Sequence, residues 1–183
     1  AEAIENVLVP FAPIIETLVA PIPGLEAFLD DPNLLVVDCR FNLVKPLAGR
    51  SSWREGHVPG AYYADLDNDL ADPVGPDSGR HPLPGADRLS RLFGSWGLGP
   101  ETYVVAYDDA GGAIAARLWW LLRWAGHTKA GLLDGGYAAW LAADLPIEQT
   151  EPQLLNEAYP VTVGSWPVMS TALVAERLQQ GRL

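Results

Sequence analysis

The sequence predicts an α/β fold in which helices flank a central parallel sheet. Short apolar runs at residues 34–37, 103–107 and 130–133 have the length and composition of strands buried on both faces. A helical stretch at 113–125 separates the last two runs and is followed by Gly126, the residue that helix C-termini favour. A strand–helix–strand order of this kind favours parallel pairing, so we expect a sheet between two helical layers.

The remaining elements of the predicted domain follow from shorter patterns. Residues 61–64 predict a short additional strand, and residues 86–96 and 137–143 have helical periodicity. Residues 67–84 are rich in Gly, Pro, Asp and Ser, which is typical of a long surface loop.

The C-terminal part of the chain has a different character. Residues 144–167 lose periodicity and contain several prolines, so we interpret them as a linker. Residues 171–180 predict a short amphipathic helix, and the step into it is similar to the step at residues 18–29. This similarity predicts that a second copy of the domain begins near residue 168 and is cut off at Leu183.

Composition and charge exclude several classes of partner. The chain has 12 basic and 23 acidic residues and a formal net charge of −11, which argues against binding to nucleic acid or to an anionic membrane surface. Glu16, Glu26 and several prolines interrupt the apolar stretch 7–29, which predicts neither a signal peptide nor a membrane span. The single cysteine, Cys39, permits no intrachain disulfide and no thiolate metal cage, and it favours a reducing, cytoplasmic location.

The turn that follows residues 103–107 is the most informative segment for chemistry. It contains Asp108, Asp109 and the adjacent pair Gly111 and Gly112, at the edge where open parallel sheets bind ligands. Asp134 lies at the end of the next strand, as the ribose-binding acid of a dinucleotide fold would. The glycines lack the spacing of that fingerprint, however, and the two aspartates would repel a pyrophosphate. We therefore favour Asp108 or Asp109 as a helix N-cap.

A set of short motifs, taken in order, resembles the rhodanese family. The set covers residues 18–147 and is similar to the N-terminal half of the two-domain thiosulfate and 3-mercaptopyruvate sulfurtransferases. The motifs are Val37-Asp38-Cys39-Arg40, Gly49-Arg50, Gly56-His57-Val58-Pro59-Gly60-Ala61, Gly79-Arg80-His81-Pro82-Leu83-Pro84, Ala115-Ala116-Arg117-Leu118-Trp119-Trp120 and Leu133-Asp134-Gly135-Gly136-Tyr137-Ala138-Ala139-Trp140.

The resemblance implies a three-layer rhodanese-like domain with a central parallel sheet flanked by helices, duplicated in tandem. We expect an N-terminal extension at 1–17, the rhodanese-like domain at 18–147, a linker at 148–167 and the start of a truncated second rhodanese-like domain at 168–183. The family's working site lies in the second copy.

The resemblance also implies which residues do the chemistry. In active copies a cysteine ends the central strand and opens a loop whose backbone amides hold a persulfide. Here Asp108 is at the matching position, and a carboxylate cannot carry a sulfane sulfur, so we expect no catalytic residue in this chain. Cys39 is followed by no glycine-rich loop and is expected to be buried and structural. Arg80 and Arg117 are candidates for contact with an anionic substrate or the second domain, with an ion pair to a neighbouring acid as the plainer alternative.

The other polar and aromatic residues have structural interpretations. His57 and His127 are expected to be hydrogen-bonded structural groups, and no His, Asp or Glu spacing predicts a metal site. We expect no cofactor. Four tryptophans are expected to pack helices on the sheet: Trp119, Trp120, Trp124 and Trp140.

Two functional hypotheses follow. In the first, the complete protein is a sulfurtransferase that moves sulfane sulfur from thiosulfate or 3-mercaptopyruvate to a thiophilic acceptor such as cyanide, and this chain is its noncatalytic N-terminal half. Its partners would be a second rhodanese domain of the same protein and a small anionic sulfur donor. In the second, the chain is a stand-alone binding or scaffolding module that kept the fold without the chemistry.

Overall fold

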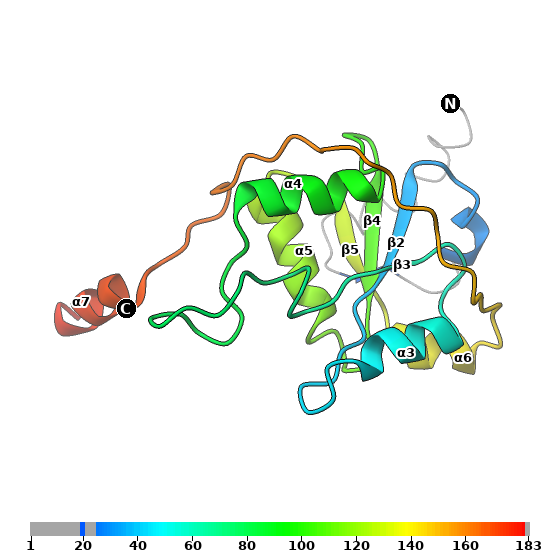
Figure 1. The fold of residues 1–183 in the computed structure, drawn as a ribbon, viewed down its shortest axis with the longest axis horizontal. Helices are drawn as coiled ribbons and strands as arrows, with labels where there is room; N and C mark the ends of the chain where they lie inside the picture. Colours follow the sequence, from blue (N-terminus) through cyan, green and yellow to red (C-terminus); the bar gives the residue numbers. More distant parts are fainter. Residues whose placement is uncertain (1–18, 21–24, 182–183) are drawn as a thin grey trace.

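The sheet has five parallel strands in the order β1-β5-β4-β2-β3 (Figure 1). The computed structural model describes residues 19–20 and 25–181. The three strands expected from apolar runs are neighbours and parallel, and the short fourth strand pairs with the first of them, so these predictions are confirmed. The strands are β1 (Val19–Ala20), β2 (Leu34–Asp38), β3 (Tyr62–Tyr63), β4 (Tyr103–Tyr107) and β5 (Ala130–Leu133).

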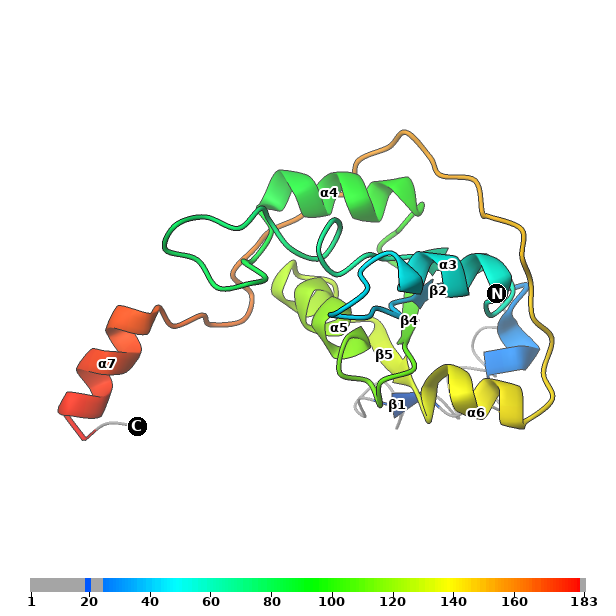
Figure 2. The same ribbon diagram turned by 60° about the horizontal axis from the view of Figure 1, so that its bottom comes forward.

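Alternate side chains of the central strands enter two separate cores, as a sheet covered on both faces requires. In β4, Val104 and Ala106 join a core with α4 (Ala86–Ser95) and α5 (Ala115–Trp124), whereas Val105 and Tyr107 face the opposite side. That second core contains Trp140 of α6 (Gly136–Ala142). The α/β architecture of three layers is thereby confirmed (Figure 2).

Two further helices flank β2 along the chain. The 3-10 helix η1 (Glu26–Phe28) precedes β2, and α3 (Ala48–Glu55) follows it. The helix expected to begin at residue 113 begins later, at Ala115. The reason is the preceding turn, in which Gly111 and Gly112 adopt positive φ angles of 69° and 87° that are incompatible with a helix.

Residues 145–166, here called the C-terminal strap, run along the outside of the domain (Figure 1). The strap contains no helix or strand, in agreement with its sequence, apart from an isolated antiparallel bridge between His57 and Glu148. It is nevertheless bonded to the domain along its length. The Leu155 amide donates to the Ser95 carbonyl at 2.8 Å, and the Tyr159 amide donates to Ser90 at 3.0 Å.

The end of the strap is held in the same way. The amide of Gly164 donates to the Trp124 carbonyl at 3.1 Å, and Trp166 packs edge-on against Trp119 with ring centroids 5.3 Å apart. The segment expected to be a linker is therefore part of the folded body as far as Trp166, while the boundaries of the domains stay predictions.

The predicted C-terminal helix is α7 (Thr171–Gln179), capped by the Ser170 hydroxyl, which accepts from the Leu173 amide at 3.2 Å. None of its residues is buried, and both views place it away from the sheet (Figures 1 and 2). The expected extension at 1–17 lies outside the described residues. Within the described ranges, no helix is long and apolar enough to cross a bilayer.

Candidate functional site at the carboxyl edge of the sheet

Asp108, the first residue after β4, has its carboxylate enclosed by backbone amides of the following turn. Oδ1 accepts from Ala110 at 2.9 Å and Gly112 at 2.8 Å, and Oδ2 accepts from Ile114 and Ala115, both at 2.8 Å. The side chain is only 1% exposed. The expected helix N-cap is wrong, because the N-cap position of α5 is Ile114 and no side chain caps the helix there. The residue that binds the amides of the turn is Asp108. Asp108 binds the amides at the start of α5 although it lies several residues before that helix. Asp109, in contrast, is exposed.

The backbone of Asp108 is fixed as well, by the start of α6. Its carbonyl accepts from the Tyr137 amide at 2.9 Å. A Cβ at Gly136 would collide with that same carbonyl oxygen, and Gly135 and Gly136 have φ angles of 67° and 59°. The two glycines after Asp134 therefore allow α6 to approach β4 closely. Asp134 itself is exposed.

The turn is thus a preformed cradle that stabilises one negative charge at the side-chain position of residue 108. Four backbone amides converge there, and α5 directs its positive end toward the same point. In this chain the charge is the protein's own carboxylate. The amides that could bind a phosphate in a nucleotide site are already occupied.

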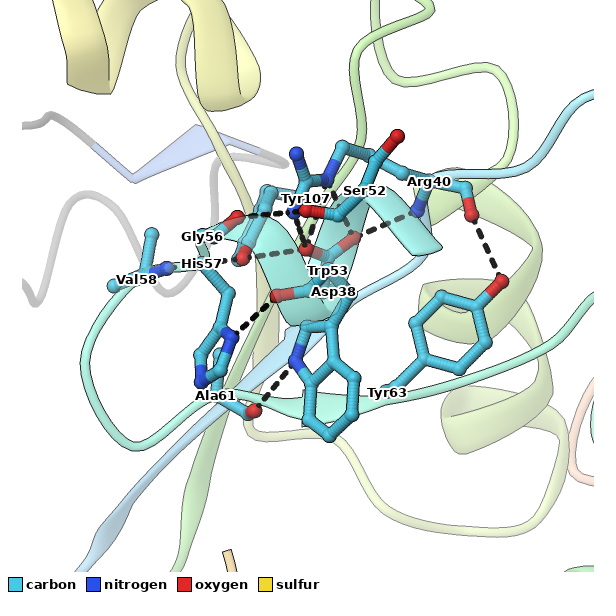
Figure 3. Close-up of polar contacts among 10 residues, drawn as sticks. All are labelled: Asp38, Arg40, Ser52, Trp53, Gly56, His57, Val58, Ala61, Tyr63 and Tyr107. Atoms are coloured by element: carbon cyan, nitrogen blue, oxygen red, sulfur yellow. Dashed lines mark hydrogen bonds and ion pairs between the residues drawn. The ribbon is translucent and has the colours of Figure 1, made fainter. Parts of the chain in front are cut away.

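A buried ion pair lies beside the cradle, at the end of β2 (Figure 3). Arg40 Nη2 lies 2.7 Å from Asp38 Oδ2, and the Tyr107 hydroxyl donates to the same oxygen at 2.7 Å. Asp38 is completely buried. Burial raises the pKa of the Asp38 carboxyl, and the donors on Arg40 oppose that rise. Burial also raises the pKa of the Tyr107 hydroxyl well above its ordinary value.

Arg40 connects this pair to two helices. Its Nη2 donates to the Gly56 carbonyl at 2.6 Å and to Ser52 at 3.2 Å, near the end of α3 (Figure 3). Its guanidinium also lies over the Tyr137 ring of α6, 3.9 Å from the centroid. The Asp38–Arg40 pair thereby joins β2, α3 and α6, and the Nε and Nη2 donors of Arg40 are used within the domain.

His57 and His127 have the structural roles expected of them. His57 is buried, with Nδ1 2.7 Å from the Trp53 carbonyl and its ring stacked on Trp53 (Figure 3). His127 is buried as well, with Nε2 2.9 Å from the Thr102 carbonyl and Nδ1 3.2 Å from the Tyr159 hydroxyl. Burial lowers the pKa of His127.

Cys39 is 0% exposed and belongs to the core beneath α4 and α5. Burial raises the pKa of its thiol well above the ordinary value, and the charges of Asp38 and Asp108 raise it further. A thiol with a raised pKa forms little thiolate, and the thiolate is the nucleophile, so Cys39 is not activated for catalysis. Its burial agrees with the sequence-based expectation.

The two candidate arginines make different contacts from the ion pairs that the sequence left as the plainer alternative. Arg117 on α5 donates to the carbonyls of Leu70, at 2.8 Å, and of His81 and Pro82, both at 3.0 Å. Arg80 donates to the Leu43 carbonyl at 2.8 Å. Within the described part of the chain neither arginine forms an ion pair, so that alternative is wrong: Arg117 anchors the 67–84 loop, and Arg80 remains exposed.

The sequence predicted neither the Asp38–Arg40 pair nor a polar pair in the surface loop. His81 Nε2 lies 2.9 Å from Asp67 Oδ1, and the two residues lie at opposite ends of the surface loop. A loop without periodicity provides no signal for such a contact, because the pairing depends on how the loop folds back on itself. Among the described residues, no group of three or more His, Cys, Asp or Glu side chains could hold a metal ion.

Comparison with known proteins places this geometry in a family. The family model described as "Rhodanese-like domain" matches residues 23–143. The chain belongs to the rhodanese family. The match covers the whole sheet except β1, both helical layers, and the cradle that holds Asp108. The three-layer rhodanese fold expected from the motifs is therefore confirmed.

Relatives of this rhodanese domain include named sulfurtransferases. A Pseudomonas aeruginosa protein named "Probable 3-mercaptopyruvate sulfurtransferase" is 49% identical over 132 residues, which is 71% of this chain and 46% of that protein. The thiosulfate sulfurtransferase of Azotobacter vinelandii is 34% identical over 158 residues, 84% of this chain and 53% of that protein. The chain spans about half the length of these relatives.

Solved structures of sulfurtransferases superimpose on this domain. A 3-mercaptopyruvate sulfurtransferase from Leishmania major superimposes with a TM-score of 0.71 at 30% identity, covering 80% of this chain and 41% of that protein. SseA from Escherichia coli, whose title names 3-mercaptopyruvate sulfotransferases, gives a TM-score of 0.79 at 25% identity, covering 90% of this chain and 63% of that protein.

Proposed function

We propose that the complete protein is a sulfurtransferase that takes sulfane sulfur from thiosulfate or 3-mercaptopyruvate, and that this chain is its noncatalytic N-terminal half. The observation that carries the proposal is the 49% identity to the Pseudomonas aeruginosa relative, of which this chain spans 46%. With thiosulfate as donor, the sulfur–sulfur bond breaks, sulfite leaves, and the transferred sulfur ends on the acceptor; with cyanide the product is thiocyanate.

The chemistry of the cradle supports a noncatalytic role for this half. Sulfur transfer of this kind requires a nucleophile that attacks the sulfane sulfur and holds it as a persulfide. Asp108 occupies the cradle with a carboxylate that already accepts four hydrogen bonds, and the thiol of Cys39 is completely buried. We therefore assign the catalytic cysteine to a second rhodanese-like domain of the same protein.

An exposed apolar loop is the surface we assign to that second domain. The loop joins β2 to α3 and lies at the carboxyl edge, where Val44 and Leu47 are 88% and 80% exposed. Its shape is held by Asn42 Oδ1, which accepts from Val44 and Lys45, both at 2.9 Å, and by the Arg80 bond to Leu43. Rigid apolar side chains of this exposure favour an interaction surface.

The proposal includes a cytoplasmic location, supported by the single, unpaired cysteine. It also includes a small anionic sulfur donor, because both thiosulfate and 3-mercaptopyruvate are anions. Two cations of this domain lie at that surface: Lys45 is exposed within the apolar loop, and Arg80 is exposed beside it.

The test compares this 183-residue chain with the natural polypeptide that contains it. Thiocyanate formation from thiosulfate and cyanide, and pyruvate formation from 3-mercaptopyruvate, are measured for both. We expect turnover by the longer polypeptide and none by this chain. Turnover by this chain that disappears in Cys39→Ser would make Cys39 the nucleophile and overturn the proposal.

A stand-alone binding or scaffolding module is the second candidate function. The observation that favours it is the same cradle, filled by a carboxylate that cannot form a persulfide. A natural polypeptide that ends near Leu183 and shows neither activity would decide for it.

A further inference from the structure

An open hollow of about 320 Å³ lies between the start of the 67–84 loop and α4. It is separate from the Asp108 cradle and plays no part in the proposed sulfur transfer. Two arginines one turn apart on α4 face it, together with residues from the loop and one apolar side chain. Its lining consists of Asn68, Asp69, Arg88, Arg91 and Leu92.

The two arginines differ in how far they are already engaged. Arg88 donates to the Asn68 carbonyl and lies 3.9 Å from the Asp72 carboxylate. Arg91 is exposed, and within the described part of the chain its guanidinium has no hydrogen bond or ion pair. Arg91 therefore offers its donors to a ligand without breaking an existing contact, and a guanidinium binds a carboxylate in a bidentate manner.

The opposite wall is held rigid by hydrogen bonds within the loop. Asp65 Oδ1 accepts from the amides of Asp67 at 3.0 Å and Asn68 at 2.9 Å, and the Asp65 amide donates to Asp69 Oδ2 at 2.8 Å. Leu70, which follows, is completely buried. The hollow is consequently preorganised, which lowers the entropic cost of binding.

The charges around the hollow are mixed. In a chain with 23 acidic and 12 basic residues, two neighbouring arginines face this one hollow and supply its positive charge. Asp69 brings an acceptor into the same lining, and its second oxygen has no hydrogen bond among the described residues. A ligand that satisfies both sides has a carboxylate and, next to it, a hydrogen-bond donor.

We propose that this hollow binds a small α-amino or α-hydroxy acid, with the carboxylate on Arg91 and Arg88 and the amino or hydroxyl group facing Asp69. Leu92 contacts the apolar part of the ligand. The site is open and offers few contacts, so the expected dissociation constant is in the millimolar range, of order 1–10 mM.

Ligand-observed NMR titration of this chain at constant ionic strength tests the proposal. The probes are L-alanine for the amino acids, L-lactate for the hydroxy acids and acetate as a carboxylate without the donor. We expect saturable binding of L-alanine or L-lactate, and about fivefold weaker binding of acetate. The stronger of the first two probes identifies the class of ligand.

Two matched variants locate the site. Arg91→Gln should weaken binding about tenfold or more. Arg177→Gln removes another exposed helical arginine, on α7, and should leave binding unchanged. The absence of saturable binding in the wild-type chain, acetate binding as strong as that of both other probes, or an unchanged affinity in Arg91→Gln would overturn the proposal. None of these readouts depends on sulfurtransferase activity.

Discussion

The carboxylate of Asp108 accepts a hydrogen bond at 2.8 Å from the amide of Ala115, the first residue of α5. The contact closes a turn that contains two glycines with positive φ, and the other three bonds to the same carboxylate fill its interior. The side chain at position 108 therefore organises both the loop and the start of the helix. Substitutions there test its contribution to stability and the ability of the amides to stabilise a negative charge.

Removal of the Asp108 carboxylate should destabilise the domain. Asp108→Ala leaves four amide donors without their acceptor, and we expect a loss of about 1–3 kcal/mol in the free energy of unfolding, measured by urea denaturation. Asp109→Ala is the matched control, because Asp109 is exposed, and should change stability by less than about 0.5 kcal/mol. Equal midpoints for the two variants would contradict this role for Asp108.

A cysteine at position 108 should have a lowered thiol pKa. In Asp108→Cys on a Cys39→Ala background, the amides that now face the carboxylate would stabilise a thiolate, so its pKa should fall below the usual value of about 8.5. The pH dependence of iodoacetamide alkylation measures it, with the buried Cys39 of the wild-type chain as the unreactive control. We expect little or no sulfur transfer by this variant, because a lowered thiol pKa alone does not provide a binding site for the sulfur donor. A pKa at or above 8.5 would show that the amides do not converge on a sulfur.

The sheet could be predicted from the sequence because its strands are short and apolar on both faces. Val104 and Val105 enter different cores, so no alternation of polar and apolar residues was needed to recognise β4. Part of the role of Asp108 could be anticipated, because an aspartate near a helix start often accepts from its amides, but the sequence placed it at the N-cap, which is Ile114.

Contacts between distant segments could not be predicted. Arg117 reaches the carbonyls of Leu70 and Pro82, and nothing in the composition of a loop indicates which of its carbonyls face inward. The strap was expected to be a linker because it lacks periodicity, yet its backbone amides bind α4 and α5, and backbone contacts leave no trace in the pattern of side chains. Tyr159 and Trp166 add side-chain contacts to distant residues, which no periodicity indicates. Gly94 is one position whose residue type depends on that contact, because a side chain there would collide with the strap.

Gly94 on α4 should be required for the strap to remain bound. A Cβ there would collide with the carbonyl of Glu157, although alanine is otherwise the better helix former. We expect Gly94→Ala to accelerate hydrogen exchange at the amides of Leu155 and Tyr159 about tenfold or more. Gly79→Ala is the control, since a Cβ at Gly79 meets nothing within 4 Å. Unchanged protection in Gly94→Ala would mean that the strap yields without detaching.

The stability of the domain should fall as the pH drops below neutrality, through His127. Burial lowers the pKa of His127 in the folded state, whereas in the unfolded chain it titrates near 6.5. Below about pH 6.5 the unfolded chain therefore binds a proton that the folded chain does not, and the free energy of unfolding decreases until the pH reaches the lower, folded pKa. The slope from this group cannot exceed about 1.4 kcal/mol per pH unit.

Urea denaturation at pH values from about 8 to about 5 checks this expectation, with His127→Gln as the comparison. Glutamine can still donate to the Thr102 carbonyl, which accepts from His127 Nε2 at 2.9 Å, but it does not titrate. The difference in unfolding free energy between the wild type and the variant should therefore be constant above pH 7 and shrink as the pH falls. Because all other titratable groups are the same in both proteins, their contributions cancel in that difference. A difference that stays constant down to pH 5 would show that His127 takes up its proton equally in the folded and the unfolded chain.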